Sequence, residues 1–477
     1  MTVSTPNVTD VVIVGAGLSG LRAALEVYRA GLSVVVLEAM DRVGGKTLSL
    51  ESSAGNAKVD LGAAWINDTN QSEMYALAKE FGFELIQQRV TGDGLEQQPD
   101  GSVISFPPGL PAVMTPEQIK MFQQFVDVIK GHIERSHPES PHLGPDAAML
   151  DSMTLEAYAE KYSPGSFGLF LADSLAICLL GVQARELSAL YMIDYLKAGT
   201  GIENMISDRK HGGQYLRNRQ SNQTFSVRLA AQLPDSAIHL STPVTKITRL
   251  PGHGCMIQTA GSGPVFQAKR VIVSVPTPLY SLITFEPPLP AAKQALGDNT
   301  ALGYYAKTIF VFDRPWWHEA GLSGIMQSME GPIGFSRDTC SEKDNQYSIT
   351  CFLVGDTGRA WSKWSAVERR RLVTAQFDAV MGSTARAKGI DVPPPINVIE
   401  KEWVKDPWAL GAPCPVMLPG VLTADSGKAI RSPVDNIHFV GTETSLVWKG
   451  YMEGAVRSGV RGAKEVIDAL TAQICRD

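Results

Sequence analysis

Two hydrophobic runs near the N-terminus do not alternate with polar positions. Val11 to Val14 are all aliphatic, and Leu32 to Leu37 is nearly as apolar. Continuous runs of this kind are typical of strands that are buried on both faces of a parallel sheet. Between them, Leu21 to Ala30 carries its apolar side chains on one helical face and ends at Gly31. This order predicts a strand–helix–strand unit.

The turn between the first strand and the helix is Gly15-Ala16-Gly17-Leu18-Ser19-Gly20. In a GxGxxG turn, Gly15 permits the tight bend, Gly17 lets the backbone approach a pyrophosphate, and Gly20 lets helix and strand pack closely. Glu38 ends the second strand, where a carboxylate accepts hydrogen bonds from ribose hydroxyls and repels a 2′-phosphate. The unit favours FAD or NAD over NADP, and a plain glycine-rich turn is the alternative.

The next residues favour FAD. Asp41-Arg42-Val43-Gly44-Gly45-Lys46-Thr47 places two adjacent glycines beside basic side chains, which suits a second approach to the pyrophosphate. Val11 to Thr47 as a whole resembles the entry motif of the flavin-dependent amine oxidases. That family usually has arginine where this chain has Lys46, and lysine keeps the charge but not the planar fork. Val59 to Trp65 resembles the strand and turn beside the flavin ring, with an ordinary turn as the alternative.

A second motif lies near the C-terminus. Val434 to Thr444 predicts a short strand that ends in a glycine turn, and Trp448 to Val456 opens a helix that we expect to end near Ala469. This segment resembles the C-terminal FAD motif of the monoamine oxidase family. A helix N-terminus beside the flavin ring would stabilise the negative charge of the reduced ring. The resemblance implies FAD contacts from Gly15, Gly17, Leu18, Ser19, Gly20, Glu38, Ala39, Arg42, Gly44, Gly45, Lys46, Gly62, Ala63, Ala64, Trp65, Val244, Trp403, Ala412, Gly441, Thr442, Glu443, Gly450, Tyr451, Met452 and Ala455.

The resemblance covers nearly the whole chain and implies its architecture. We expect an α/β protein of the amine oxidase type, in which an FAD-binding, Rossmann-like GxGxxG domain is interleaved with an α+β substrate domain. The FAD domain takes residues 1–90, 215–285 and 400–477, and the substrate domain takes 91–214 and 286–399. We expect strands of the FAD domain at Ala237 to Ile247 and Lys269 to Pro276. We expect helices of the substrate domain at Pro116 to Glu134 and Met153 to Lys161.

The implied chemistry is the oxidation of an amine. A hydride moves from the carbon that bears the nitrogen to flavin N5, the imine hydrolyses to an aldehyde or ketone plus ammonia, and O2 regenerates the flavin and yields H2O2. Lys307 precedes the apolar run Thr308 to Phe312, at the position where the family has a lysine that holds a water against N5. We expect it to order water and assist O2, with a solvent-facing lysine on an edge strand as the alternative.

The substrate cavity is implied by residues far apart in the sequence. Ile177, Cys178, Met205, Ile206 and Gln214 would line it, although the apolar members also suit a plain core and Gln214 a turn. Tyr451 would form one wall of the family's aromatic cage and act with Lys307 in catalysis, while Trp403 would lie beneath the flavin.

The second wall of the cage departs from the family pattern. Pro413 stands in the cage position, and Ala412 stands where some relatives have the cysteine that bonds to the flavin. Because alanine has no nucleophile, we expect non-covalent FAD, unless Cys414 takes that role. A half-open cage would admit bulkier or longer amines than a small arylalkylamine.

Composition narrows the class of protein. The 477 residues hold 43 Lys and Arg against 49 Asp and Glu, a formal charge of −6 without a long basic run, which argues against nucleic acid as a partner. Six scattered cysteines without CxxC pairs indicate neither a zinc site nor a disulfide scaffold. Gly168 to Val182 carries Asp173 and predicts a buried helix rather than a membrane span. We expect a cytoplasmic enzyme with an amine and O2 as partners, no metal, no membrane, and a homodimer as one option.

Three other functions stay open at this point, of which a non-enzymatic scaffold or demethylase-type partner is the weakest, because no extra helical insertion or histone-tail groove is visible. A flavin dehydrogenase or desaturase with an acceptor other than O2 would share the fold. An L-amino-acid oxidase would need an arginine that faces the cavity, for which Arg217 is the candidate. Asp208-Arg209-Lys210-His211 is interpreted as a solvated turn, but at the cavity mouth it would favour substrates whose acidic groups lie far from the amine.

Overall fold

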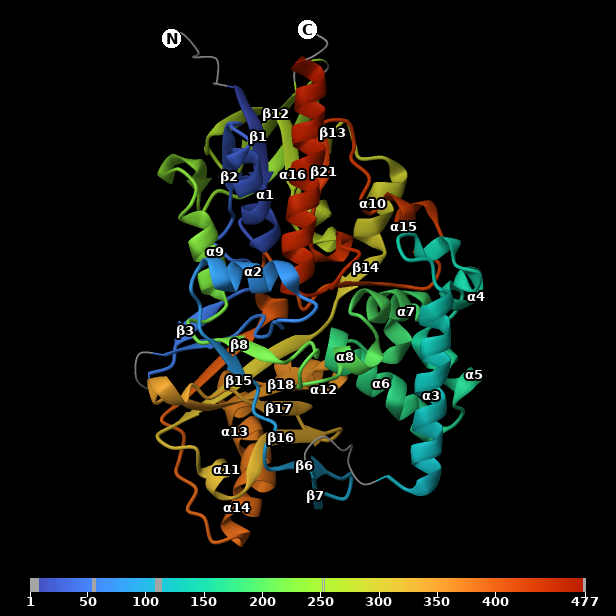
Figure 1. Ribbon diagram of the computed structural model, residues 1–477, viewed down its shortest axis with the longest axis vertical. Helices are drawn as coiled ribbons and strands as arrows, with labels where there is room; N and C mark the ends of the chain where they lie inside the picture. The colour runs from blue at the N-terminus through green and yellow to red at the C-terminus, as the bar shows by residue number, and fades with distance from the viewer. Residues whose placement is uncertain (1–7, 54–56, 108–113, 251, 253, 475–477) are drawn as a thin grey trace.

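The computed structural model describes residues 8–53, 57–107, 114–250, 252 and 254–474 (Figure 1). The first two apolar runs form the parallel strands β1 (Val8–Val14) and β2 (Val34–Leu37), with helix α1 (Leu18–Arg29) between them. The predicted strand–helix–strand unit is confirmed, and the interior residues of both strands are buried.

The first large sheet collects strands from three distant parts of the chain. Its order is β13-β10-β11-β12-β1-β2-β9, and β21 pairs with β12. Strands β2, β1, β12 and β21 are parallel neighbours, so their carboxyl ends meet at one edge. The expected strand 237–247 is instead two strands, β9 and β10. The remaining members are β9 (Ile238–His239), β10 (Val244–Leu250), β11 (Gly254–Thr259), β12 (Val265–Val273), β13 (Thr284–Glu286) and β21 (Ile437–Phe439).

Helix α16 (Met452–Ile474) packs beside α1 on this sheet, as the red and blue helices of Figure 1 show. The two helices approach closely at Gly459, where an added Cβ would lie 2.4 Å from the carbonyl oxygen of Ser19. The helix runs beyond the end expected near Ala469. Helices α2 (Ser72–Glu80) and α9 (Gln223–Ala230) complete this layer.

A second sheet has the order β19-β15-β18-β17-β16-β6-β7. Strand β15 (Tyr305–Phe312) is interior, because it pairs with β18 on one side and β19 on the other. Trp316 and Trp317 pack fully buried in the core beside this sheet. The other strands are β6 (Asp93–Gln97), β7 (Val103–Phe106), β16 (Leu322–Ser328), β17 (Phe335–Asp338), β18 (Tyr347–Val354) and β19 (Asn397–Glu402).

A group of helices forms the third part of the molecule, on the right in Figure 1. The expected buried helix is α6 (Ser166–Leu180), and among the described residues no helix has the length and apolar character needed to cross a membrane. The group comprises α3 (Pro116–Arg135), α4 (Ala147–Asp151), α5 (Leu155–Tyr162), α6, α7 (Ala189–Ala198) and α8 (Ile202–Met205).

Short elements connect these parts. The small paired strands are β3 (Ser49–Glu51) with β4 (Lys58–Asp60), β5 (Leu85–Gln87) with β8 (Leu216–Asn218), and β14 (Thr300–Leu302) with β20 (Pro415–Met417). The remaining helices are α10 (Ala291–Asp298), α11 (Trp316–Glu319), α12 (Gly355–Ser362), α13 (Ala366–Phe377), α14 (Ser383–Ala387) and α15 (Asp425–Ala429).

The two large sheets use different parts of the chain. The first takes strands from 8–37, 238–286 and 437–439, and the second from 93–106 and 305–402. Strand β13 ends one residue beyond the boundary placed at 285, and β19 crosses the boundary placed at 400. The division into an FAD domain and a substrate domain stays a prediction with these small adjustments.

Candidate active site

A cavity of about 1330 Å³ runs between the two large sheets and the helical group. It begins at the glycine turn before α1, passes Lys307 and Tyr451, and continues along α6 toward Phe122 of α3. All the residues predicted to contact FAD or substrate line this cavity except Gly20 and Arg42. The fold therefore brings together side chains that are up to several hundred positions apart.

The start of α1 offers backbone donors to the cavity. Its N-cap, Gly17, makes no side-chain cap, and Leu18 and Ser19 line the cavity. A Cβ added to Gly17 would meet no heavy atom within 4 Å, so the space in front of it is open. Gly44 bridges to this turn, since its N–H donates to the carbonyl of Ala16 at 2.8 Å. An uncapped helix N-terminus beside an open space is a suitable site for phosphate.

Glu38 lies at the carboxyl end of β2, where the sequence motif places it. Its carboxylate accepts hydrogen bonds from the backbone N–H groups of Ala16, at 2.6 Å, and Met40, at 2.9 Å. Burial raises the pKa of Glu38, while these backbone donors oppose the rise. The carboxylate lines the cavity beside the glycine turn, in a position suited to a ribose.

Gly20 and Arg42 support the site from behind. A Cβ at Gly20 would come within 2.0 Å of the carbonyl oxygen of Gly15, so this glycine permits close packing of helix against turn. The Arg42 guanidinium donates to the carbonyl of Gly45 at 2.9 Å and to that of Thr47 at 3.4 Å. Arg42 thereby fixes the second glycine loop and does not itself line the cavity.

Lys46 occupies the end of this loop as a half-buried cation. Its Nζ donates to the carbonyl of Pro413 at 3.2 Å, which connects the N-terminal loop to the segment of the expected cage wall. Burial lowers the pKa of Lys46, and the neighbouring Glu443 carboxylate opposes that shift. A half-buried ammonium with one backbone acceptor fits an anionic ligand beside it.

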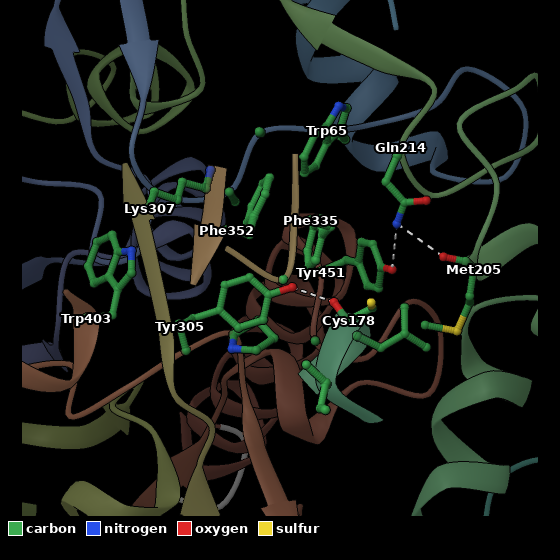
Figure 2. A pocket seen from close by; sticks show the side chains of 18 of the residues that line it. Trp65, Cys178, Met205, Gln214, Tyr305, Lys307, Phe335, Phe352, Trp403 and Tyr451 are labelled. Atoms are coloured by element: carbon green, nitrogen blue, oxygen red, sulfur yellow. Dashed lines mark hydrogen bonds between the residues drawn. The ribbon is translucent and has the colours of Figure 1, made fainter. Parts of the chain in front are cut away.

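Lys307 reaches the cavity from the interior strand β15. Its Nζ donates to the carbonyls of Asp60, at 3.0 Å, and Gly62, at 2.5 Å, and it lies 5.1 Å from the centre of the Phe352 ring (Figure 2). Burial lowers the pKa of Lys307 to about 8. Because β15 is not an edge strand and the side chain is 4% exposed, the solvent-facing alternative is wrong.

Trp403 fastens the same turn from the other side. Its indole N–H donates to the carbonyl of Leu61 at 3.0 Å. Lys307 and Trp403 together hold the backbone of residues 60–62, and both line the cavity. The turn expected beside the flavin ring is thus fixed by two side chains from distant segments.

Aromatic rings surround the chamber in front of Lys307, as Figure 2 shows. Tyr305, Phe335 and Phe352 were not among the predicted residues. Phe335 and Phe352 are register partners on β17 and β18 and stack with ring centres 4.4 Å apart. The hydroxyl of Tyr305 donates to the carbonyl of Cys178 on α6. The face of β17 and β18 that meets the cavity depends on pairing between strands, and the residue pattern of each strand alone does not show it.

Tyr451 forms a wall of the chamber and is held from three sides. Trp448 packs edge-on against it with ring centres 4.8 Å apart, and Tyr195 lies behind it at 6.5 Å. Gln214 donates through Nε2 to the carbonyl of Met205 at 3.1 Å and lies 3.5 Å from the Tyr451 hydroxyl. Burial raises the pKa of Tyr451, so this phenol is neutral.

Comparison with known proteins identifies this arrangement. Residues 18–467 match the family of flavin-containing amine oxidoreductases. The chain belongs to this family. It is 30% identical to flavin-containing amine oxidase B of Homo sapiens over 466 residues, which cover 97% of this chain and 87% of that protein.

Solved structures agree with this assignment. Wild-type putrescine oxidase bound to putrescine superimposes with a TM-score of 0.88 at 26% identity, covering 96% of this chain and 99% of that one. Cyclohexylamine oxidase from Brevibacterium oxydans gives a TM-score of 0.86 at 29% identity, covering 97% and 99%. The family resemblance and the α/β fold are confirmed, and the chain is an FAD-dependent amine oxidase.

The cavity of this amine oxidase fits its cofactor. The uncapped start of α1, the open space at Gly17 and the half-buried Lys46 suit a pyrophosphate, and Glu38 suits a ribose. At the other end, Thr442, Met452 and the start of α16 line the cavity. A helix N-terminus there would face the part of the flavin that becomes negative on reduction.

The segment 412–414 bears on how this amine oxidase holds its flavin. Ala412 and Pro413 line the cavity. Cys414 is fully buried behind them, with its sulfur 3.8 Å from the Tyr191 hydroxyl, and it does not line the cavity. Burial raises the pKa of the Cys414 thiol to about 11. Ala412 has no sulfur, and the Cys414 thiol is neutral and does not face the cavity, so this segment offers no thiolate to a cofactor there.

The charged cluster 208–211 divides between cavity and surface. Asp208 and Arg209 line the cavity, whereas Lys210 and His211 are exposed outside it. The interpretation as a solvated turn is wrong for Asp208, whose side chain is 11% exposed and pairs with Arg337 at 2.9 Å. Arg337 was not predicted.

Arg217, the candidate for a carboxylate-binding arginine, lies elsewhere. It is buried on β8 and donates to the carbonyl of Cys340 at 2.5 Å, and it does not line the cavity. That role for Arg217 is wrong, because its guanidinium already serves the backbone of a neighbouring loop.

One cluster of metal-ligand types lies outside the cavity. His318, Asp338 and Cys340 bring their ligand atoms within 4.8 Å of one another. Asp338 accepts hydrogen bonds from the Trp317 indole at 2.8 Å and from the backbone N–H of Cys340 at 2.9 Å, and it lies 2.6 Å from His318. The carboxylate thus joins the Trp317 helix to β17, which accounts for the cluster by hydrogen bonding.

Proposed function

We propose that this enzyme oxidatively deaminates bulky or long-chain primary amines and passes the electrons to O2. The observation that supports this is the extent of the cavity beyond Lys307. It continues past Ile177 and Leu171 of α6 to Phe122 of α3, between walls that are mostly apolar. A small amine would leave most of that length unfilled, whereas a long apolar chain would bury its surface there.

The chain's own residues prepare the amine. FAD supplies the hydride acceptor when it is bound. The aromatic chamber disfavours an ammonium, because a charge loses its hydration there without gaining an ionic partner, so the amine binds as the neutral base that can give up a hydride. Tyr451 and Phe352 confine the amine, and Gln214 orients it by hydrogen bonding.

Lys307 would act in the second half of the reaction. Its ammonium lies against the turn 60–62, where a water could bridge it to the site of chemistry. A fixed cation stabilises the negative charge that develops as O2 takes up electrons. With a pKa of about 8 and two backbone acceptors, Lys307 is protonated near neutral pH and is not required to abstract a proton.

The amine specificity is tested with a panel of n-alkylamines of increasing length, benzylamine and putrescine, with H2O2 as the readout. We expect kcat/KM to rise with chain length, because each methylene buried along α6 contributes about 0.8 kcal/mol. A sharp preference for benzylamine over every long alkylamine would contradict this substrate class. Turnover with an artificial electron acceptor but without H2O2 in air would instead support the dehydrogenase alternative.

We also propose that FAD is held without a covalent bond. Acid precipitation of the purified yellow protein is expected to leave the flavin in the supernatant, and Cys414→Ser is expected to behave identically, since Cys414 faces Tyr191. Flavin that stays with the precipitate of the parent protein would contradict the proposal. If the flavin were then released only from Cys414→Ser, Cys414 would be the residue that bonds to it. A cytoplasmic location and a homodimer stay predictions.

A further inference from the structure

Within the part of the chain that the structure describes, one ion pair joins two side chains that line this cavity, Asp208 and Arg337. Phe335 and Arg337 are two residues apart on β17, so they project from the same face of the sheet, and both line the cavity. Asp338, the last residue of β17, points to the opposite face and accepts a hydrogen bond from the Trp317 indole. Strand alternation therefore delivers an arginine into the channel beside an aromatic wall.

Both members of the pair line the cavity, and their side chains are similarly exposed, Arg337 at 16% and Asp208 at 11%. Asp208 Oδ2 is 2.9 Å from Nε of Arg337, and among the described residues neither this Nε nor the buried Asp208 Oδ1 has a hydrogen-bond partner. Nη1 of Arg337 donates to the carbonyl of Ser336 at 2.9 Å. No hydrogen bond within the described chain engages Nη2, and this nitrogen is not among the buried unpaired atoms. The edge that Arg337 presents to the channel thus consists of donors.

The position of Arg337 relative to the chemistry follows from a chain of contacts. Its guanidinium carbon lies 5.7 Å from the Phe335 ring centre, Phe335 stacks on Phe352 at 4.4 Å, and Lys307 Nζ lies 5.1 Å from Phe352. Two aromatic rings therefore stand between Arg337 and Lys307. A substrate group that meets Arg337 must be separated from the reacting amine by several carbon atoms.

We propose that Arg337 recognises a carboxylate that the substrate carries several carbon atoms from its amine. This inference rests on the proposed amine oxidation and specifies its substrate class. A guanidinium edge with free donors binds a carboxylate by charge-assisted hydrogen bonds. Glu96 and Glu330 also line the cavity, so a carboxylate is favoured only where it reaches Arg337, and its distance from the amine becomes decisive.

The test compares straight-chain ω-amino carboxylates with n-alkylamines of equal length, using H2O2 release to obtain kcat and KM for each. We expect one range of chain lengths in which the carboxylated amine has the lower KM, and no such advantage for L-α-amino acids. Arg337→Leu should reduce the ratio of kcat/KM for carboxylated over plain amine by roughly 10- to 100-fold, mainly through KM. Arg337→Lys should recover part of it, because charge returns without the fork.

Asp208→Asn gives a test with a definite sign. It leaves the Arg337 charge uncompensated, so KM for the carboxylated amine should fall, whereas general damage to the channel would raise it. Arg386→Gln is the matched control, since Arg386 forms a surface pair with Asp378 at 2.7 Å outside the cavity. This variant should leave kcat and KM unchanged for both the carboxylated and the plain amines.

The outcomes separate the two proposals. Plain amines oxidised without any preference for a distal carboxylate, or equal losses for both classes in Arg337→Leu, would overturn the role of Arg337 alone. No oxidation of any amine would overturn the proposed function itself.

Discussion

Replacing Lys307 by methionine will slow the reaction of the reduced enzyme with O2 by about 100-fold, the size of effect typical for removing one preorganised donor from developing charge. Reduction of the enzyme by amine under anaerobic conditions should change by less than about tenfold, since the lysine is not needed to take a proton from the substrate. Stopped-flow measurement of the two half-reactions separates these effects.

The pH dependence of the same step has a definite direction. The acid form of Lys307 carries the charge, and burial places its pKa at about 8. Reaction with O2 should therefore be fast below that pH and slow as pH rises through it, and Lys307→Met should lose this dependence. A profile that survives unchanged in the variant would assign the titration to another group.

Lys293→Met provides the matched control for lost stability. Lys293 is also buried and also donates to backbone carbonyls, those of Ala429 and Ile430, but it lies outside the cavity. Both variants should melt at lower temperature than the parent, because each leaves two partly buried carbonyls without their donor. Only Lys307→Met should slow the reaction of the reduced enzyme with O2. Equal loss of that rate in both would indicate a structural effect.

Gly17→Ala is expected to remove bound flavin without unfolding the protein. The new methyl group meets no atom of the chain within 4 Å, and Gly17 has an extended backbone that alanine adopts readily, so the flavin-free protein should keep its stability. The methyl group would instead enter the space where the pyrophosphate must approach the backbone. We expect FAD affinity to fall by about 100-fold, equivalent to one or two charge-assisted hydrogen bonds of about 1.5–3 kcal/mol.

Two further glycines sharpen this test. Gly297→Ala lies in α10 outside the cavity, with its nearest neighbour at an ordinary 3.5 Å, and should retain flavin. Gly20→Ala would bring a methyl group within 2.0 Å of the Gly15 carbonyl and should lower the melting temperature as well. Far-UV circular dichroism with flavin titration distinguishes the three. Full flavin binding by Gly17→Ala would place the pyrophosphate elsewhere.

The parts of the site that could be predicted are those encoded by contiguous residues. The glycine turn at 15–20, Glu38 and the loop 41–47 follow from one strand–helix–strand unit, whose geometry is local. The two ends of the cofactor cavity were both recognised, since each depends on a short motif beside a helix N-terminus. Lys307 needed the family resemblance, because its strand pattern alone fits an edge position.

The residues that escaped prediction depend on pairing between distant strands. Phe335 and Arg337 face the cavity because β17 pairs with β18 in one register, and a shift by one residue would turn Ser336 and Asp338 there instead. Asp208 was assigned to solvent because its partner is more than a hundred residues away. Such contacts carry no signal in a window of neighbouring residues.

The central claim is that this cavity holds FAD with its reactive ring facing a neutral long-chain amine beside Lys307. Anaerobic mixing of the purified yellow protein with a long-chain primary amine, followed by flavin absorbance, tests it most directly. We expect the flavin to be bleached with formation of one aldehyde per flavin, and air to restore the colour with release of one H2O2. A protein that carries flavin yet stays oxidised with every amine of the panel would contradict this claim.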